Sequence, residues 1–246
     1  FSTMKRVWKE ASSVIIAAKP KSFLRSRMSR DCSLSILALK RHSDSSVLPN
    51  FYVFPGGHTH HSDSSESGEE FFHNQHANIS LRIAAIRETF EECGILLCKR
   101  FEEKKQDIDK HLEIESIAQW RQQVIADASN FIKLCVENKC YPNVTALSLW
   151  SNWKTPVNIP AKKFDVAFFL VVLEDCYRAI PDSIEIEEIG DVSKLSKFAK
   201  QRNKSNCELF FPIMCFLDDR MVSILPVILR CAYLNVISYF VLGSAK

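Results

Sequence analysis

The residues of this chain best suited to chemistry are three carboxylates crowded into one short segment. Glu88, Glu91 and Glu92 lie beside Arg87 in the stretch IRETFEECGILL. An α-helix turns about 100° per residue, so a helix here places all three acids within one arc of its surface. Glu88 and Glu92 repel each other by roughly 0.2–0.5 kcal/mol, which a divalent cation would offset. Carboxylate oxygens suit Mg²⁺ or Mn²⁺; a solvated acidic helix end is the alternative interpretation.

A helix over residues 81–93 is predicted to carry these acids. Ile83, Ile86 and Phe90 fall on its opposite side and give it an apolar face that packs on a core. Gly94 follows directly and is of the residue type that ends helices in the left-handed conformation.

The segments around this helix alternate between strand and helix patterns, which indicates an α/β or α+β protein. Apolar, β-branched and aromatic runs predict strands at 14–18, 33–39, 51–54, 94–98 and 164–173. Helical spacing predicts helices within 102–138, at 193–204 and at 209–222. The polar segment 58–78 is predicted to be an exposed loop, in which five histidines make a zinc site a weaker alternative.

Two segments match the pattern of a known family. Residues 87–95, RETFEECGI, fit the second half of the Nudix box, R-E-U-x-E-E-x-G-U with U apolar, apart from Thr89. The VFPGG of residues 53–57 corresponds to the strand and glycine pair that open the box. The sequence therefore resembles the Nudix hydrolases. The resemblance implies an α/β fold, the Nudix α/β/α sandwich with a mixed central sheet, over residues 7–220, with a helical insertion at about 102–138.

The box departs from the family pattern in its first half. Gly57 and Arg87 are 30 residues apart, which is 16 more than the standard box allows. The glutamate expected six residues after the glycine is Asp63, which keeps the charge. Because the acids of residues 88–92 follow the insertion, the helix that carries them is expected to survive it.

Further segments resemble the peroxisomal branch of coenzyme A and acyl-coenzyme A diphosphatases, which has an insertion in the box. They include LALKRHSDSSVLPNFYVFPGG and KKFDVAFFLVVLE. This branch implies metal-dependent hydrolysis of the pyrophosphate of coenzyme A or acyl-coenzyme A, giving 3′,5′-ADP and (acyl-)4′-phosphopantetheine. Hydrolysis of another nucleoside diphosphate derivative, such as ADP-ribose, is one alternative. A catalytically silent nucleotide-binding domain is another.

The resemblance also assigns roles within the box. Glu88 and Glu92 are expected to bind Mg²⁺ or Mn²⁺, with Glu91 as a third ligand or as the base toward water. Arg87 is expected to orient a neighbouring carboxylate, and Gly56 with Gly57 to let the backbone approach the helix and the phosphates. A base from another loop is the alternative, for which the candidates are Glu185, Glu187 and Glu188.

Binding of the nucleotide requires cations and flat side chains elsewhere in the chain. Lys40 and Arg41 are the first candidates for the 3′-phosphate, with Lys162 and Lys163 as alternatives. Trp153, together with Trp150 in an apparent loop, is a candidate to stack on adenine or to line an acyl-pantetheine groove. Surface solvation of the cations and packing of the tryptophans are the competing interpretations.

Composition limits the partners and the compartment. A net charge of +3 is too small to indicate nucleic acid binding, and the absence of a GxxxxGK[ST] loop argues against an ATPase. Nine scattered cysteines without a CxxC pair indicate reduced thiols inside the cell, peroxisomal by resemblance, with the cytoplasm or mitochondria as alternatives. The apolar segment 221–246 contains Pro226 and Arg230, which disfavour membrane insertion. The small-molecule substrate is the one partner predicted, and the sequence leaves the oligomeric state open.

Overall fold

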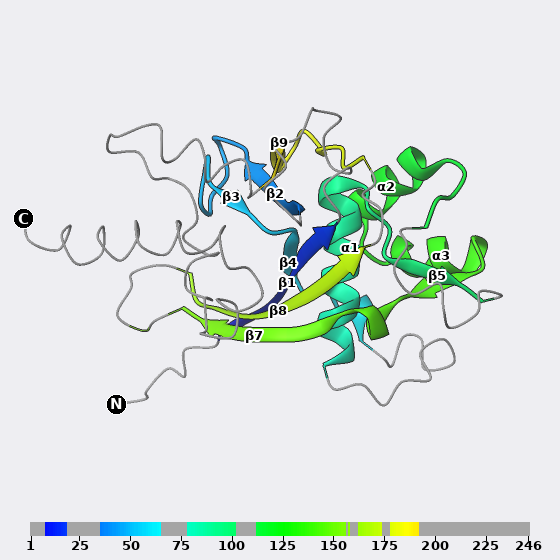
Figure 1. Ribbon diagram of the computed structural model, residues 1–246, viewed down its shortest axis with the longest axis horizontal. Coiled ribbons are helices and arrows are strands. Elements are labelled where there is room, and N and C mark those ends of the chain that lie inside the picture. The colour runs from blue at the N-terminus through cyan, green and yellow to red at the C-terminus, as the bar shows by residue number, and fades with distance from the viewer. Residues whose placement is uncertain are drawn as a thin grey trace, which may run out of the picture.

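The computed structural model describes residues 8–18, 35–64, 78–101, 112–155, 157, 162–173 and 178–191 (Figure 1). The helices expected at 193–204 and 209–222 and the apolar segment 221–246 lie outside these residues. In the part of the chain that is described, no helix is both long and apolar enough to cross a membrane.

A mixed seven-stranded sheet forms the centre of the molecule. Its order is β3-β2-β1-β8-β7, with β4 paired to β1 and β9 paired to β2. The long strands β1 and β8 run parallel, and the other neighbours are antiparallel. The strands are β1 (Lys9–Ala18), β2 (Ser35–Arg41), β3 (Tyr52–Val53), β4 (Gly56–His58), β7 (Ser148–Lys154), β8 (Phe164–Leu173) and β9 (Ile186–Asp191). A separate two-stranded sheet joins β5 (Cys98–Arg100) to β6 (Cys140–Pro142).

Strand β1 changes its antiparallel partner along its length. Ser13 pairs with Gly56 of β4, whereas Ala17 pairs with Ile36 of β2. At the change of partner, the carbonyl oxygen of Pro55 accepts a hydrogen bond of 2.9 Å from the backbone N–H of Val14. The glycine pair is therefore held against the middle of the sheet.

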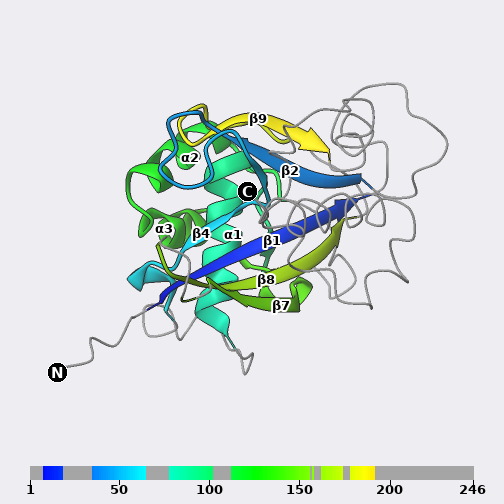
Figure 2. The same ribbon diagram turned by 90° about the vertical axis from the view of Figure 1, so that its left-hand side faces the viewer.

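Helix α1 (Ile79–Cys93) crosses β1 and β8 and carries the predicted acids (Figures 1 and 2). Its apolar face is buried as predicted, since Ile83, Ile86 and Phe90 are at most 2% exposed. Gly94 adopts φ = 74°, and its N–H bonds the carbonyl oxygen of Phe90 at 2.9 Å, which confirms it as the residue that ends the helix. Thr89 stands at an apolar position of the box, and its hydroxyl is satisfied by the carbonyl oxygen of Ala85 at 2.7 Å.

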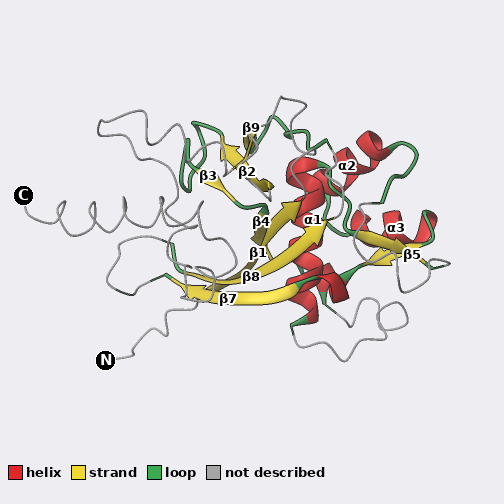
Figure 3. Ribbon diagram, in the orientation of Figure 1, coloured by secondary structure: helices red, strands yellow, loops and turns green. Residues whose placement is uncertain are grey.

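Two helices, α2 (Ile117–Ala126) and α3 (Asn130–Glu137), lie beyond α1 on the side away from β3 (Figure 3). They form the helical part of the predicted insertion 102–138, of which residues 102–111 lie outside the described residues. Residues 112–116 are not helical, which corrects the prediction there. Asp127 separates the two helices with ψ = 112°, and its side chain accepts a hydrogen bond from the N–H of Ser129.

The prediction of a strand at 94–98 is wrong except at Cys98, the first residue of β5. Residues 95–97 are buried without joining a ladder, because their carbonyl groups serve two different segments. The oxygen of Leu96 accepts from the N–H of Leu112, and the oxygen of Leu97 accepts from the N–H of Asn143.

Five further elements were assigned to loops or not predicted. Strand β7 contains Trp150 and Trp153, which were expected in a loop. Strand β9 was not predicted, because acidic residues interrupt its apolar pattern. The segment 58–78 was expected to be exposed throughout, but it begins with β4 and the 3₁₀-helix η1 (His61–Asp63), whose Ser62 and Asp63 are buried. A second 3₁₀-helix, η3 (Val144–Ala146), precedes β7.

Candidate active site

Arg87 is the organising residue of the acidic cluster. It is 3% exposed, and its Nε and Nη2 donate to the two carboxylate oxygens of Asp63, each at 3.0 Å. Its Nη1 donates to Glu88 at 3.0 Å and to Glu91 at 2.6 Å. Burial alone would lower the pKa of Arg87, but the hydrogen bonds and charges of these acids raise it above its ordinary value. Arg87 therefore fixes the positions of two predicted site carboxylates.

Two glycines bring the chain within contact of the helix. The N–H of Gly56 donates to Oε2 of Glu92 at 2.8 Å. A Cβ atom at Gly56 would collide with the backbone of Ser12, and a Cβ atom at Gly57 would overlap the carboxylate of Glu88. Only glycine at both positions lets β4 lie against β1 and α1 at the same time.

Burial shapes the electrostatics of the three acids. It raises the pKa of Glu88 to about 7, although the charge of Arg87 opposes the shift. It also raises the pKa of Glu91, again against Arg87. The pKa of Glu92, which is 3% exposed, rises well above its usual range through burial and through the neighbouring charge of Glu88. The positive charge near the three acids thus does not balance their negative charge. Their carboxylate oxygens are hard donors that suit Mg²⁺ or Mn²⁺.

Strands β2 and β9 bring one cation and one further acid to this face. Nη1 of Arg41 lies 4.0 Å from Oε1 of Glu92, and its Nη2 lies 3.4 Å from Oε2 of Glu185. The adjacent Lys40 pairs instead with Glu187 at 3.1 Å. Of the two predicted cations, the structure therefore brings Arg41 to the acids, and of the alternative bases it brings Glu185.

The predicted tryptophan lies in a different part of the sheet. Trp153 pairs with Val166 across β7 and β8, and β8 and β1 separate β7 from the strand of Arg41. Lys162 and Lys163 directly precede β8. In the sheet, Trp153 is therefore separated from the strand of Arg41 by two strands.

Two residues beside the acids were not among the predicted site residues. Asp63 carried a usable signal, since it stands six residues after Gly57 where the box has an acid, but its partner Arg87 was not foreseen. Arg121 of α2 donates from Nε to the carbonyl oxygen of Glu91 at 2.8 Å. No pattern indicated Arg121, because it comes from the insertion and bonds only to backbone at this point.

A second group with metal-binding chemistry lies away from the carboxylates. The sulfur atoms of Cys98, Cys135 and Cys140 lie within 4.8 Å of one another, on β5, α3 and β6. All three thiols are at most 3% exposed and are free. Sulfur ligands suit soft cations rather than Mg²⁺, and small buried thiols also serve as apolar packing. This cluster joins the helical insertion to the small sheet.

Comparisons with known proteins identify the family of the chain. The family model described as the NUDT19 Nudix domain matches residues 8–79 and 75–207. The chain is 28% identical to acyl-coenzyme A diphosphatase NUDT19 of Xenopus laevis, over 90% of this chain and 80% of that protein. It is 26% identical to the protein of the same name in Homo sapiens, over 89% of this chain and 79% of that one.

A solved structure supports the fold independently. The crystal structure of a Nudix hydrolase from Alicyclobacillus acidocaldarius superposes with a TM-score of 0.64 at 18% identity, covering 85% of this chain and 88% of the other. The predicted α/β Nudix fold with a mixed central sheet is thereby confirmed. With the match to the family model, these findings show that the chain belongs to the NUDT19 Nudix domain family and is a Nudix pyrophosphohydrolase.

Proposed function

We propose that this protein hydrolyses the pyrophosphate bond of coenzyme A or acyl-coenzyme A in a reaction that requires Mg²⁺ or Mn²⁺. The products would be 3′,5′-ADP and 4′-phosphopantetheine or its acyl form. The observation that carries the proposal is the face formed by Glu88, Glu91 and Glu92, three acids that burial makes costly to ionise without a cation. The names of the relatives from Xenopus laevis and Homo sapiens support the choice of substrate.

The described residues fit a divalent cation at this face. Glu88 and Glu92 would hold it, because Glu91 is the acid bound most closely by Arg87. When bound there by Glu88 and Glu92, a cation would supply positive charge to screen the pyrophosphate and to activate water. Arg87 keeps Glu88 and Glu91 in place, and Gly57 leaves room for the carboxylate of Glu88.

Other side chains are placed to handle the phosphate and the proton. Arg41 lies beside Glu92 and Glu185, so its guanidinium group is available to a phosphate oxygen at the edge of the acidic face. Glu185, whose side chain is 60% exposed and pairs with Arg41, would take the proton from the attacking water. Glu91 is the alternative base, since burial raises its pKa, but its carboxylate is held by Nη1 of Arg87 at 2.6 Å.

One assay tests the proposal. The protein is incubated with Mg²⁺ and, in separate reactions, coenzyme A, octanoyl-coenzyme A or ADP-ribose, and the nucleotide products are separated. We expect 3′,5′-ADP from the coenzyme A substrates, and its loss in Glu92→Gln. Glu137→Gln on the exposed end of α3 is the matched control and should retain turnover. Release of AMP from ADP-ribose alone would move the proposal to another nucleotide, and inertness of the wild type would support a silent binding domain.

A further inference from the structure

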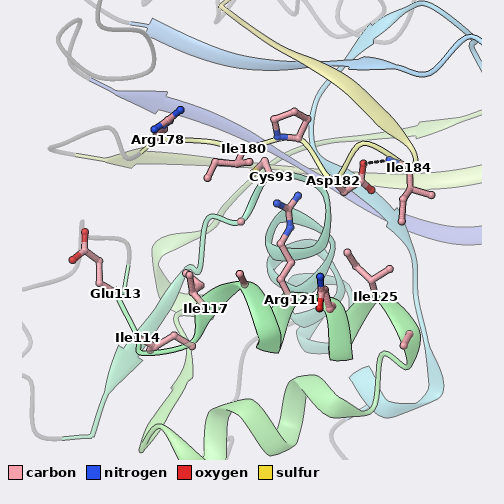
Figure 4. Close-up of a pocket in the computed structure, with 15 residues that line it drawn as sticks. Cys93, Glu113, Ile114, Ile117, Arg121, Ile125, Arg178, Ile180, Asp182 and Ile184 are labelled. Atoms are coloured by element: carbon pink, nitrogen blue, oxygen red, sulfur yellow. Dashed lines mark hydrogen bonds between the residues drawn. The ribbon is translucent and has the colours of Figure 1, made fainter.

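A cavity of about 740 Å³ lies beside the end of helix α1 (Figure 4). Helix α2 forms one wall, and the segment 178–184 forms the facing wall. The cavity is lined by charged side chains, which include Glu113, Arg178 and Asp182, and by five isoleucines, namely Ile114, Ile117, Ile125, Ile180 and Ile184. This volume falls within the range of roughly 300–1,000 Å³ that is usual for small-molecule sites. Apolar walls of this kind favour a hydrophobic ligand.

Arg121 is one of the charged residues that line this cavity. Its side chain rises from α2 toward Cys93 and Asp182 in Figure 4, and its Nε is fixed by the carbonyl oxygen of Glu91. Its buried Nη2 has no hydrogen-bond partner among the described residues. A buried donor left without a partner costs free energy. A ligand with a carbonyl oxygen at this level of the cavity would satisfy that donor after a small adjustment of the side chain.

The cavity borders the acidic face at two points of the chain. Cys93 lines the cavity and directly follows Glu92, while Ile184 lines it and directly precedes Glu185. The segment 178–184 is tied to the end of α1 there, because the N–H of Ile180 bonds the carbonyl oxygen of Cys93 at 3.0 Å. A molecule whose pyrophosphate lies at the acids therefore has one end next to an apolar cavity.

We infer that this cavity binds the acyl-pantetheine arm of the substrate, an inference that rests on the function proposed above. The arm carries amide and thioester carbonyl groups that match the free donor of Arg121, and an acyl chain that matches the isoleucines. Recognition of the acyl chain is thereby assigned to the insertion, through α2, and to the segment that leads into β9.

The inference is tested with a series of substrates that differ in chain length. Each buried CH₂ group strengthens binding by about fourfold. We expect KM of the wild type to fall from butanoyl- through hexanoyl- to octanoyl-coenzyme A by up to about 16-fold per step of two CH₂ groups. Ile184→Ser should flatten this dependence. Its side chain is 67% exposed, so the substitution is expected to leave folding intact, which thermal unfolding checks.

The matched control is Val136→Ser on α3, which is 48% exposed and does not line the cavity. It should keep the wild-type dependence on chain length. If Ile184→Ser and Val136→Ser show the same dependence, or if the wild type shows none, the cavity does not hold the acyl chain. Either result leaves the proposed function intact as long as coenzyme A yields 3′,5′-ADP. Absence of 3′,5′-ADP from every coenzyme A substrate would instead overturn the proposed function itself.

Discussion

The buried pair of Arg87 and Asp63 makes a sharp prediction for Asp63→Asn. The two side chains are 3% and 2% exposed and share two hydrogen bonds of 3.0 Å. Asparagine keeps one carbonyl oxygen, so one of these bonds survives, but its NH₂ group then faces an N–H of the guanidinium. Breaking a buried ion pair by removing one partner costs about 3–5 kcal/mol.

The structure places the expected loss at the lower end of that range. Glu88 and Glu91 still contact Arg87, so its charge does not become isolated. A loss of about 3 kcal/mol should lower the Tm by about 6–12 °C in a domain of this size.

Thermal unfolding followed by circular dichroism measures this change, with Asp44→Asn as the control. Asp44 has a side chain that is 89% exposed and lies 3.7 Å from His42, so its substitution should change the free energy of unfolding by less than about 0.5 kcal/mol. Equal Tm values for the two variants would refute the conclusion that Asp63 anchors the helix through Arg87.

Three further predictions concern the glycine pair, the acids and the thiols. Gly57→Ala should lower kcat/KM for coenzyme A at least about tenfold, because the new methyl group displaces the carboxylate of Glu88; unchanged kinetics would contradict the contact. In metal-free protein the pKa of Glu88 is raised from 4.5 to about 7 by burial, so the folded state binds more protons than the unfolded state between these values. The free energy of unfolding should therefore fall as pH rises through this window, by up to about 1.4 kcal/mol per pH unit. Urea unfolding at several pH values should show a weaker dependence on pH for Glu88→Gln than for the wild type. Equal dependence on pH in the two proteins would count against a buried Glu88. A short iodoacetamide pulse followed by peptide mapping should leave four buried thiols unlabelled until the protein unfolds, namely Cys93, Cys98, Cys135 and Cys140. Rapid labelling of these thiols in the native state would place them at the surface.

Helix α1 could be predicted from sequence because every signal for it is local. The apolar residues Ile83, Ile86 and Phe90 repeat with helical spacing, the acids share the other side, and Gly94 marks the end. Strand β8 and residues 14–18 of β1 were predicted for a similar reason, since residues 14–18 are all apolar and buried and β8 is apolar apart from Asp165. Local periodicity is sufficient wherever one element has one uniform environment.

Features that depend on distant partners could not be predicted in this way. Asp63 is buried because Arg87 lies 24 residues later, and nothing near Asp63 in the sequence signals that pairing. Leu96 and Leu97 look like strand residues, but their carbonyl groups bond two unrelated segments. Arg121 reaches the acids only because the insertion folds back on α1, which is a tertiary contact without a sequence pattern.

Binding of Mn²⁺, measured by the electron paramagnetic resonance signal of the free ion, tests the central claim most directly. The claim is that Glu88 and Glu92 hold the divalent cation on which hydrolysis depends. The account predicts at least one site in the wild type and in Glu137→Gln, and affinity at least about tenfold weaker in both Glu88→Gln and Glu92→Gln. Mn²⁺ affinity equal to that of the wild type in both of these variants would contradict it.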